Sequence, residues 1–468
     1  MNREKALVKN TIILGLGTFI PQLFNFITIP ILTRYLSTDE YGIYDLLLTI
    51  VGLLLPIVTL QIQAAGFRYL IDTRDDTERC RVIISNILVF VTSVSMITLT
   101  AFFLVLKNQS PLLKILICLY LFLDVLYNCI GQIARGLSDN VGYAIGALVL
   151  SAGKTILIVI LVAWNGRGIY GIVFSFVLAY LFADLTVAAR IQLHKYIKMS
   201  VVSFAKMKKL LKYSWPLVPN NLSSWVLNMS DRLVITCFLG TSVNAIYAAA
   251  NNIPNMVNVA RSVLIMAWQE NASMAVGDKD AESYFTKMHR TIYSMIVGIT
   301  AFLIGITPVL FKILIRGNYA EAYNQIPILF MGVFFGCISS FQAGIYVAHM
   351  KTLEVGISTF ICAVINLALD FAMIESIGIY AGSVSTVVSY FFLFLYRLTD
   401  IKKFQKIIYD YKEIIGGVCI LAVMAVLSSM NNIWVNMLNF IIGCVLAVVG
   451  NRGIIMEKWK GKSKNEKD

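Results

Sequence analysis

The residues best suited to chemistry in this sequence are charged side chains placed inside long apolar segments. They are Asp45, Asp124, Lys154, Asp231, Arg232, Arg261 and Glu270. An Arg in the middle of a membrane costs roughly 2.5–3.5 kcal/mol on insertion scales, so it normally has a partner or a function. The planar guanidinium group of Arg binds phosphate oxygens in pairs. Arg232 and Arg261 therefore predict a site for a diphosphate or another anion, which Arg34 and Arg68 would extend.

The same arginines also have structural interpretations. Arg232 would pair with Asp231 beside it in the sequence, or with Glu270. Arg34 and Arg68 lie near the ends of their segments, where long basic side chains reach out to lipid headgroups. The sequence leaves both interpretations open.

Acidic residues in the apolar segments predict either ion pairs or ion-binding sites. Lys154 and Asp124 lie at similar depths of neighbouring segments, which predicts a structural ion pair. An unpaired acid at such a depth is suited to binding a proton or a sodium ion. The candidates for that role are Asp231, Glu270 and Asp45, followed by Asp184 and Asp370.

Uncharged polar residues form stripes at three- to four-residue spacing along four of the apolar segments. Such stripes either line a hydrophilic cavity or hold neighbouring helices together by hydrogen bonds. We favour a cavity, because the corresponding segments carry stripes in both halves of the chain. The amide side chains proposed to bind a polar substrate there are Asn25, Asn221, Asn228, Asn255 and Asn258.

Motifs for covalent catalysis or metal binding are missing from the sequence. There is no nucleophile elbow, no phosphate-cradling loop and no zinc motif. The eight Cys and three His residues lack metal-ligand spacing, so we expect neither a metal site nor an organic cofactor. The sequence predicts a protein that is not an enzyme.

The elements that must position these residues are membrane-spanning helices. The 468-residue chain is 58% hydrophobic and only 14% charged, against about a quarter charged in soluble domains. A span needs roughly 20 apolar residues. We predict an all-α polytopic membrane protein with fourteen spans, at 11–33, 42–65, 83–106, 112–134, 142–164, 169–189, 213–237, 244–268, 291–315, 325–349, 353–374, 378–398, 414–430 and 433–451.

The distribution of basic residues predicts the orientation of these spans. With the N-terminus inside, 30 of the 39 Lys and Arg residues lie in inner segments and 6 lie near or outside the outer boundary. This asymmetry places both termini in the cytoplasm. The net charge of +13 is therefore mainly a topology signal, and we expect no nucleic-acid partner.

Two internal similarities divide the chain into halves. Residues 168–182 and 378–392 are identical at seven of fifteen positions, and the first span resembles the seventh. This predicts a six-helix lobe at 1–200, a second at 201–408, and an appended helix pair with a basic cytoplasmic tail at 409–468. Between the lobes, 190–212 predicts a basic amphipathic helix on anionic inner-leaflet lipid, and 401–412 is a second candidate. Both segments would serve equally as basic linkers.

Three segments resemble bacterial oligosaccharide flippases of the Wzx-like group. The stretch 211–240, with its Pro219, Asp231, Arg232 and Gly240, is similar to the seventh helix of that family. The segment 29–44, with Arg34, Tyr35, Glu40 and Gly42, is similar to the end of its first helix. The segment 365–385, with Asn366, Gly378 and Ser385, is similar to helices eleven and twelve. The wider superfamily of multidrug, oligosaccharidyl-lipid and polysaccharide (MOP) flippases also contains drug exporters and the lipid II flippase.

The resemblance implies a fold and an activity. It implies two six-helix bundles in a V shape, with two extra helices here. It implies movement of undecaprenyl-diphosphate-linked repeat units from the inner to the outer leaflet of a bacterial cytoplasmic membrane, for O-antigen, capsule or exopolysaccharide. Coupling to protons or sodium and contact with other polysaccharide-assembly proteins belong to the same expectation. The alternatives are an ion-coupled multidrug exporter and, less favoured, a membrane polysaccharide polymerase or ligase.

Overall fold

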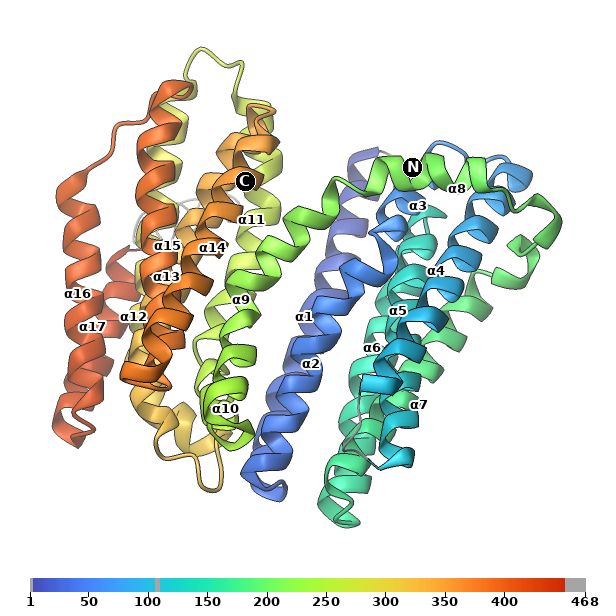
Figure 1. Cartoon of the computed structure of the whole chain (residues 1–468). Helices are drawn as coiled ribbons and strands as arrows, with labels where there is room; N and C mark the ends of the chain where they lie inside the picture. Colours follow the sequence, from blue (N-terminus) through green and yellow to red (C-terminus); the bar gives the residue numbers. More distant parts are fainter. Residues whose placement is uncertain (1–2, 106–109, 451–468) are drawn as a thin grey trace, which may run out of the picture. The chain divides into compact units, whose positions relative to one another are not determined.

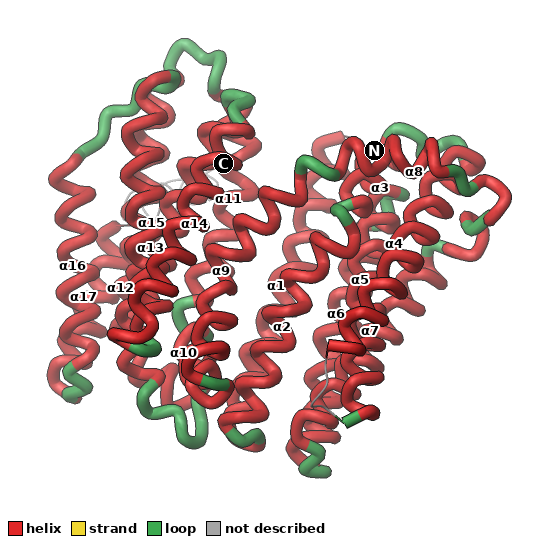
Figure 2. Tube along the Cα trace, viewed as in Figure 1, coloured by secondary structure: helices red, strands yellow, loops and turns green. Residues whose placement is uncertain are grey.

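Every regular element among the described residues, 3–105 and 110–450, is a helix in the computed structural model (Figure 2). This confirms the all-α fold expected from the composition. The first helices are α1 (Arg3–Tyr35), α2 (Thr38–Thr59), α3 (Ile62–Ile71), α4 (Thr77–Val105), α5 (Pro111–Gly136), α6 (Asn140–Ile158), α7 (Gly168–Arg190) and α8 (Phe204–Ser214). They are followed by α9 (Leu217–Leu239), α10 (Thr241–Asn251), α11 (Asn255–Ala275), α12 (Ala281–Leu314), α13 (Ala322–Ala348), α14 (Thr352–Ile377), α15 (Tyr380–Asp400), α16 (Tyr411–Ser429) and α17 (Ile433–Gly450).

The helices form two compact units, which divide within α9. Unit 1 is Met1–Trp225 and unit 2 is Val226–Asp468. In unit 1, α6 packs against α1 and α7, and α7 packs against α5 (Figure 1). In unit 2, α15 packs against α13 and α14, and α17 packs against α12. The predicted boundaries at residues 200 and 408 and the V-shaped arrangement stay predictions, and the predicted tail at 452–468 lies outside the described residues.

Ten of the described helices are long and apolar enough to cross a membrane, which makes the chain a multi-pass membrane protein. They are α2, α4 to α7 and α12 to α16. The other predicted spans correspond to α1, α9, the α10–α11 region and α17. In α9 and α11, Asn, Ser and charged residues replace apolar ones, so these helices have the polar composition that the stripes predicted.

Two of the predicted spans are broken in the structure. The span at 42–65 ends as α2 at Thr59, because Leu60 and Gln61 both take left-handed backbone conformations, with φ of 44° and 58°. The span at 244–268 divides into α10 and α11 around Pro254. Pro lacks the backbone N–H that a continuous helix needs and clashes with the preceding turn.

The two segments of the internal repeat begin alike in the structure. Gly168 is the first residue of α7 and has a φ of 52°, and Gly378 lies two residues before α15 and has a φ of 57°. Only glycine takes such a conformation without strain, so the matched glycines serve the same backbone turn. The repeat segments thus start helices that pack in the interiors of their own units.

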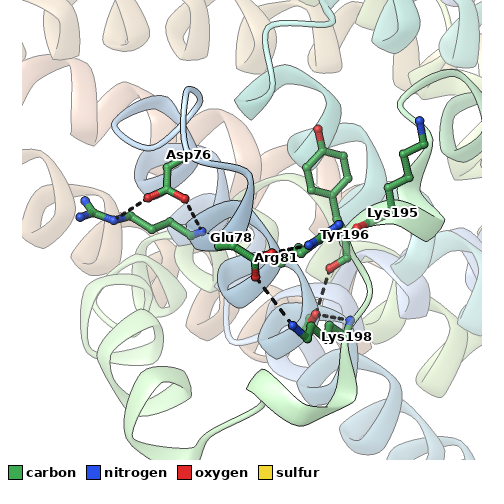
Figure 3. Close-up of polar contacts among 8 residues, drawn as sticks. Asp76, Glu78, Arg81, Lys195, Tyr196 and Lys198 are labelled. Atoms are coloured by element: carbon green, nitrogen blue, oxygen red, sulfur yellow. Dashed lines mark hydrogen bonds and ion pairs between the residues drawn. The ribbon is translucent and has the colours of Figure 1, made fainter.

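The connection between α7 and α9 is bound to the end of α4. Arg81 Nε donates to the carbonyl of Lys195 at 2.8 Å, and Lys198 Nζ lies 3.9 Å from the Glu78 carboxylate (Figure 3). Ser85 donates to the carbonyl of Tyr196 at 3.0 Å. These contacts hold the backbone of the connection on unit 1.

The predicted basic helix between the lobes is present as α8, which packs on α3 and α4 (Figure 1). Leu210 is buried and Met207 and Leu211 pack beside it, whereas the lysines at 206, 208, 209 and 212 are exposed. The second candidate, 401–412, was wrong. Only Ile401–Lys403 forms a short 3-10 helix there, and α16 begins at Tyr411.

Glycines allow α17 to lie directly against the backbone of α12. A Cβ atom at Gly443 would lie 2.6 Å from the carbonyl oxygen of Ala301 and 3.0 Å from Phe302 Cα. Backbone atoms cannot rotate out of the way, so a side chain here must push the helices apart.

We therefore expect Gly443→Ala to lower the free energy of unfolding by about 1–3 kcal/mol, as overpacking does. Thermal unfolding of the purified protein measures this effect. The matched control is Gly416→Ala on α16, where a Cβ atom meets nothing within 4 Å. That change should be neutral or stabilising by up to about 1 kcal/mol, because Ala favours helix over Gly. Equal melting temperatures for both variants would contradict the tight contact.

Candidate functional site

A cluster of buried polar side chains lies inside unit 2, between α9, α10, α14 and α15. Its centre is a pair of carboxyl groups, Asp231 on α9 and Asp370 on α14, which are 4% and 1% exposed. The two groups are close neighbours, because Ser385 donates to Asp370 and the next residue, Thr386, donates to Asp231. Two carboxylates at this distance in an apolar bundle repel each other, so the pair requires a shared proton or a bound cation.

Each carboxyl group uses one oxygen for hydrogen bonds and leaves the other free. Asp231 Oδ2 accepts from the hydroxyl of Tyr247 at 2.6 Å and from that of Thr386 at 2.8 Å. Asp370 Oδ1 accepts from Ser385 at 2.5 Å. Asp231 Oδ1 and Asp370 Oδ2 are buried and have no hydrogen-bond partner among the described residues. These two oxygens are the free ligands of the site.

Neutral side chains surround the pair and orient it. Asn366 lies one helical turn before Asp370 on α14, so both project to the same side. Its amide nitrogen donates to Ser385 Oγ at 3.2 Å, and its oxygen accepts from Ser230 at 3.3 Å. Nearby, the hydroxyl of Tyr390 donates to Asn228 at 3.2 Å. The surroundings of the carboxyl pair are therefore amide and hydroxyl groups.

Gly382 lets α15 approach α9 at the level of the pair. A Cβ atom at this position would lie 3.1 Å from Asp231 Cβ and 3.2 Å from Tyr247 Cε2. Ser385 and Thr386 follow one turn later on the same side of α15, which brings their hydroxyl groups onto the two carboxyls. The spacing of small and hydroxyl residues in α15 thus builds this wall of the site.

The donor set of the cluster consists of oxygen atoms. Among the described residues, no group of three or more His, Cys, Asp or Glu side chains is placed so that it could hold a metal ion. Carboxylate, amide and hydroxyl oxygens are ligands for hard cations, and a carboxyl pair also holds a proton. The cluster can therefore bind a proton or a small cation such as sodium in the interior of unit 2.

The basic candidates in unit 2 lie near this cluster. Arg232 is buried and follows Asp231 directly, so its charge acts on that carboxyl. Arg261 on α11 is half-buried, donates to Ser340 Oγ at 3.3 Å and lies within electrostatic reach of Tyr390. The Ser340 hydroxyl does not neutralise the positive charge of Arg261, so the guanidinium group can also bind an anion.

The remaining candidates in unit 2 lie on α9 and α11. Asn255 is exposed and accepts a hydrogen bond from Asn258 at 2.8 Å. Asn228, on α9, is exposed beside Tyr390. The side chain of Glu270 lies outside the described residues.

In unit 1 the two predicted arginines are exposed and already have partners. Arg34 lies over the ring of Tyr35, 5.4 Å from its centroid. Arg68 donates to Asp72 at 2.6 Å, and this hydrogen bond raises the pKa of the guanidinium group. Both contacts join neighbours on the same helix or turn, as in surface pairs.

The other unit 1 candidates lie on five helices, α1, α2, α5, α6 and α9. Asn25 on α1 is exposed, and Asn221 on α9 is exposed and donates to the carbonyl of Leu217 at 2.9 Å. Asp45 on α2 is buried, and its backbone carbonyl accepts from Thr49. Asp124 and Lys154 lie within electrostatic reach of each other in the core of α5 to α7.

Several residues of the cluster were missed by the sequence analysis. Tyr247, Gly382, Thr386 and Ser230 were not proposed as site residues, although Asn366 and Ser385 were part of the family resemblance. A signal was present, because Gly382, Ser385, Thr386 and Ser389 form a polar stripe at three- to four-residue spacing. Only the folded helix shows that this stripe faces Asp231.

Residues 7–268, more than half of the chain, match the sequence family described as polysaccharide biosynthesis protein. No protein with a curated description matches the sequence. Among solved structures, lipid II flippase MurJ in an inward closed conformation is similar, with 14% identity, coverage of 95% of this chain and 100% of that chain, and a TM-score of 0.71.

Two further solved structures are similar over most of their length. An outward-facing multidrug resistance MATE family transporter of the MOP superfamily has 16% identity, coverage of 86% of this chain and 96% of that chain, and a TM-score of 0.60. A MOP superfamily transporter from Pyrococcus furiosus has 15% identity, the same coverages and a TM-score of 0.59. At these identities the likeness shows the fold.

Proposed function

The chain belongs to the polysaccharide biosynthesis protein family, and on that premise we propose that it moves undecaprenyl-diphosphate-linked oligosaccharide units from the inner to the outer leaflet of the bacterial cytoplasmic membrane. The units would serve a surface polysaccharide such as O-antigen, capsule or exopolysaccharide. The observation that carries the proposal is the buried Asp231–Asp370 pair inside a membrane fold. Buried acids are costly in such a fold, and ion pathways are a common reason for them.

The carboxyl pair would couple ion entry to flipping. Two carboxylates and the guanidinium group of Arg232 sum to one negative charge, which one proton or sodium ion neutralises. An ion that binds one conformation of unit 2 more tightly than another shifts the balance between them. The membrane potential adds to this drive, because two negative charges leaving an inside-negative cell gain about 4.6 kcal/mol per 100 mV.

Substrate contacts would come from the basic and amide residues of both units. Arg261 is the strongest candidate for the diphosphate, since its described partner is neutral. Arg232, Arg34 and Arg68 are proposed with it. The amide groups proposed for the sugar are those of Asn25, Asn221, Asn228, Asn255 and Asn258. The exposed lysines of α8 would contact anionic lipids, and assembly proteins of the same pathway are further proposed partners.

Deletion of the gene tests this function. The deletion strain should lose surface polysaccharide and accumulate lipid-linked repeat units whose sugars face the cytoplasm. Labelling of those units with a membrane-impermeant reagent in intact and in opened cells measures their orientation. Restoring the gene should reverse both effects. Normal polysaccharide in a strain without a redundant transporter would reject the proposal.

The alternative function is an ion-coupled multidrug exporter, and similar structures with the MATE name favour it. Its substrates would be lipophilic organic cations, whereas the charge of Arg261 favours an anion. Efflux of tetraphenylphosphonium from the same deletion and complemented strains separates the two. Loss of efflux with intact polysaccharide would establish the exporter instead.

A further inference from the structure

Unit 1 contains a second group of buried charges, separate from the carboxyl pair of unit 2. Asp124 on α5 and Asp184 on α7 are 7% and 6% exposed, and α5 and α7 pack directly against each other. Lys154 extends from α6, which packs on both helices. Two acids and one base therefore share the core of a bundle whose helices cross the membrane.

Asp184 is the exceptional member of this group. Both of its carboxyl oxygens are buried, and neither has a hydrogen-bond partner among the described residues. One turn further along α7, Val187 belongs to an apolar cluster with Ile130 and Ile133 of α5. An ionised carboxylate in such surroundings costs several kcal/mol, whereas a protonated one is tolerated.

Lys154, the one base in the group, compensates the charge of Asp124. The Lys154 ammonium lies 5.1 Å from the ring centroid of Phe176 and 5.4 Å from that of Tyr180, and it acts electrostatically on Asp124. Asp124 also accepts a hydrogen bond from the Asn128 amide at 3.4 Å. Asp124 thus has charge compensation and a donor, while Asp184 has neither among the described residues.

Other titratable groups around the two acids do not supply a positive charge. Asp184 acts electrostatically on Tyr127 and Cys129, which are neutral hydroxyl and thiol groups, and on its neighbouring acid. The titratable groups in electrostatic contact with Asp124 or Asp184 are Tyr120, Tyr127, Cys129, Lys154 and Tyr180, and Lys154 alone among these carries a positive charge. With two acids and one base, one proton makes the whole group neutral.

We propose that Asp184, together with Asp124 and Lys154, forms a proton-binding site in unit 1. The apolar and aromatic surroundings of Asp184 favour a proton over sodium, because sodium needs several oxygen ligands of the kind that surround Asp231 and Asp370. Lys154 holds Asp124 ionised, so the proton resides on Asp184. Any use of this proton to drive flipping rests on the proposed function, whereas proton binding itself does not.

Infrared difference spectroscopy of the purified full-length protein tests the site without any transport substrate. In the background Asp231→Asn and Asp370→Asn, which removes any protonated carboxyl group of the pair in unit 2, the protein at neutral pH should show the carbonyl-stretch band of a buried protonated carboxylic acid, shifted in heavy water. The band should disappear in Asp184→Asn and move in Asp184→Glu. The matched control, Asp75→Asn, removes an exposed acid of unit 1 and should leave the band unchanged. A band that survives in folded Asp184→Asn overturns the proposal.

A second measurement uses only the wild type, in case Asp184→Asn fails to fold. Hydrophobic carbodiimides react with protonated carboxyl groups, so mass spectrometry should find Asp184 labelled at least about tenfold more than Asp124 or Asp75. Equal labelling of Asp124 and Asp184, or none of Asp184, would also overturn the proposal. Neither assay involves a polysaccharide, so a failed site and a failed flippase function remain distinguishable.

Discussion

The double variant Asp231→Asn and Asp370→Asn is expected to fold, to reach the membrane in normal amounts, and to lose transport by more than about tenfold. Asparagine keeps the shape of the side chain and an oxygen that accepts from Tyr247, Thr386 and Ser385. It removes both negative charges, so the site no longer binds a cation or exchanges a proton. An ion that no longer binds one conformation more tightly than another cannot shift the equilibrium between them. Each 1.4 kcal/mol of binding free energy lost changes that equilibrium constant tenfold.

Two measurements check this result. Restoration of surface polysaccharide in the deletion strain reports transport, and the melting temperature in sodium against choline chloride reports ion binding. A sodium-dependent rise in the wild type that vanishes in the double variant identifies sodium; no rise in either identifies the proton. The matched control is Glu375→Gln, which removes an exposed charge from the same helix as Asp370. Full complementation by the double variant would remove the pair from the mechanism.

The second large effect is expected at Arg397, where a buried guanidinium group joins three helices of unit 2. Arg397 lies on α15 and is 3% exposed. Its nitrogens donate to the carbonyl of Ser339 on α13 at 2.8 Å and to Ser358 and Thr359 on α14, each at 2.9 Å. Arg397 also donates a hydrogen bond to the carbonyl of Val355. Its hydrogen-bond partners among the described residues are neutral oxygens, so the contact is one of helix packing.

We expect Arg397→Met to lower the free energy of unfolding by about 3 kcal/mol or more, because it removes several charge-assisted hydrogen bonds and leaves their acceptors buried. Thermal unfolding in detergent and the yield of monodisperse protein measure this loss. Arg290→Met is the control, since Arg290 is largely exposed beside Glu413, and such pairs contribute about 0–1 kcal/mol. If Arg397→Met and Arg290→Met have equal melting temperatures, the Arg397 hydrogen bonds do not stabilise the packing of the three helices.

The sequence predicted the helical membrane fold because insertion into a bilayer depends on local composition. Long apolar segments such as those of α5, α7 and α14 are visible without any contact information. The polar helices α9 and α11 were also recognised, because their Asn and Ser residues recur at helical spacing. The break at Leu60 was missed, since a window of average hydropathy passes over a change in backbone direction.

Some of the buried charged residues were recognised from the sequence, whereas the burial of Arg397 was not. Asp231, Asp124 and Lys154 were found from sequence because a charge inside an apolar segment is conspicuous. Arg397 was assigned to the inner segments as a topology residue, although its side chain is buried among oxygens of α13 and α14. An arginine at the end of a span next to basic residues has the same sequence neighbourhood whether its side chain is buried or exposed.

Composition and spacing alone are enough to recognise a multi-pass helical bundle with rare acids and arginines inside it. The way these residues combine is visible in the folded chain: Asp231 lies with Asp370, Tyr247 and Thr386, and Asp184 has no hydrogen-bond partner among the described residues. The physical reason is that the cost of burying a charge depends on composition, which is local. Its compensation depends on side chains from helices far apart in the chain, which packing alone brings together.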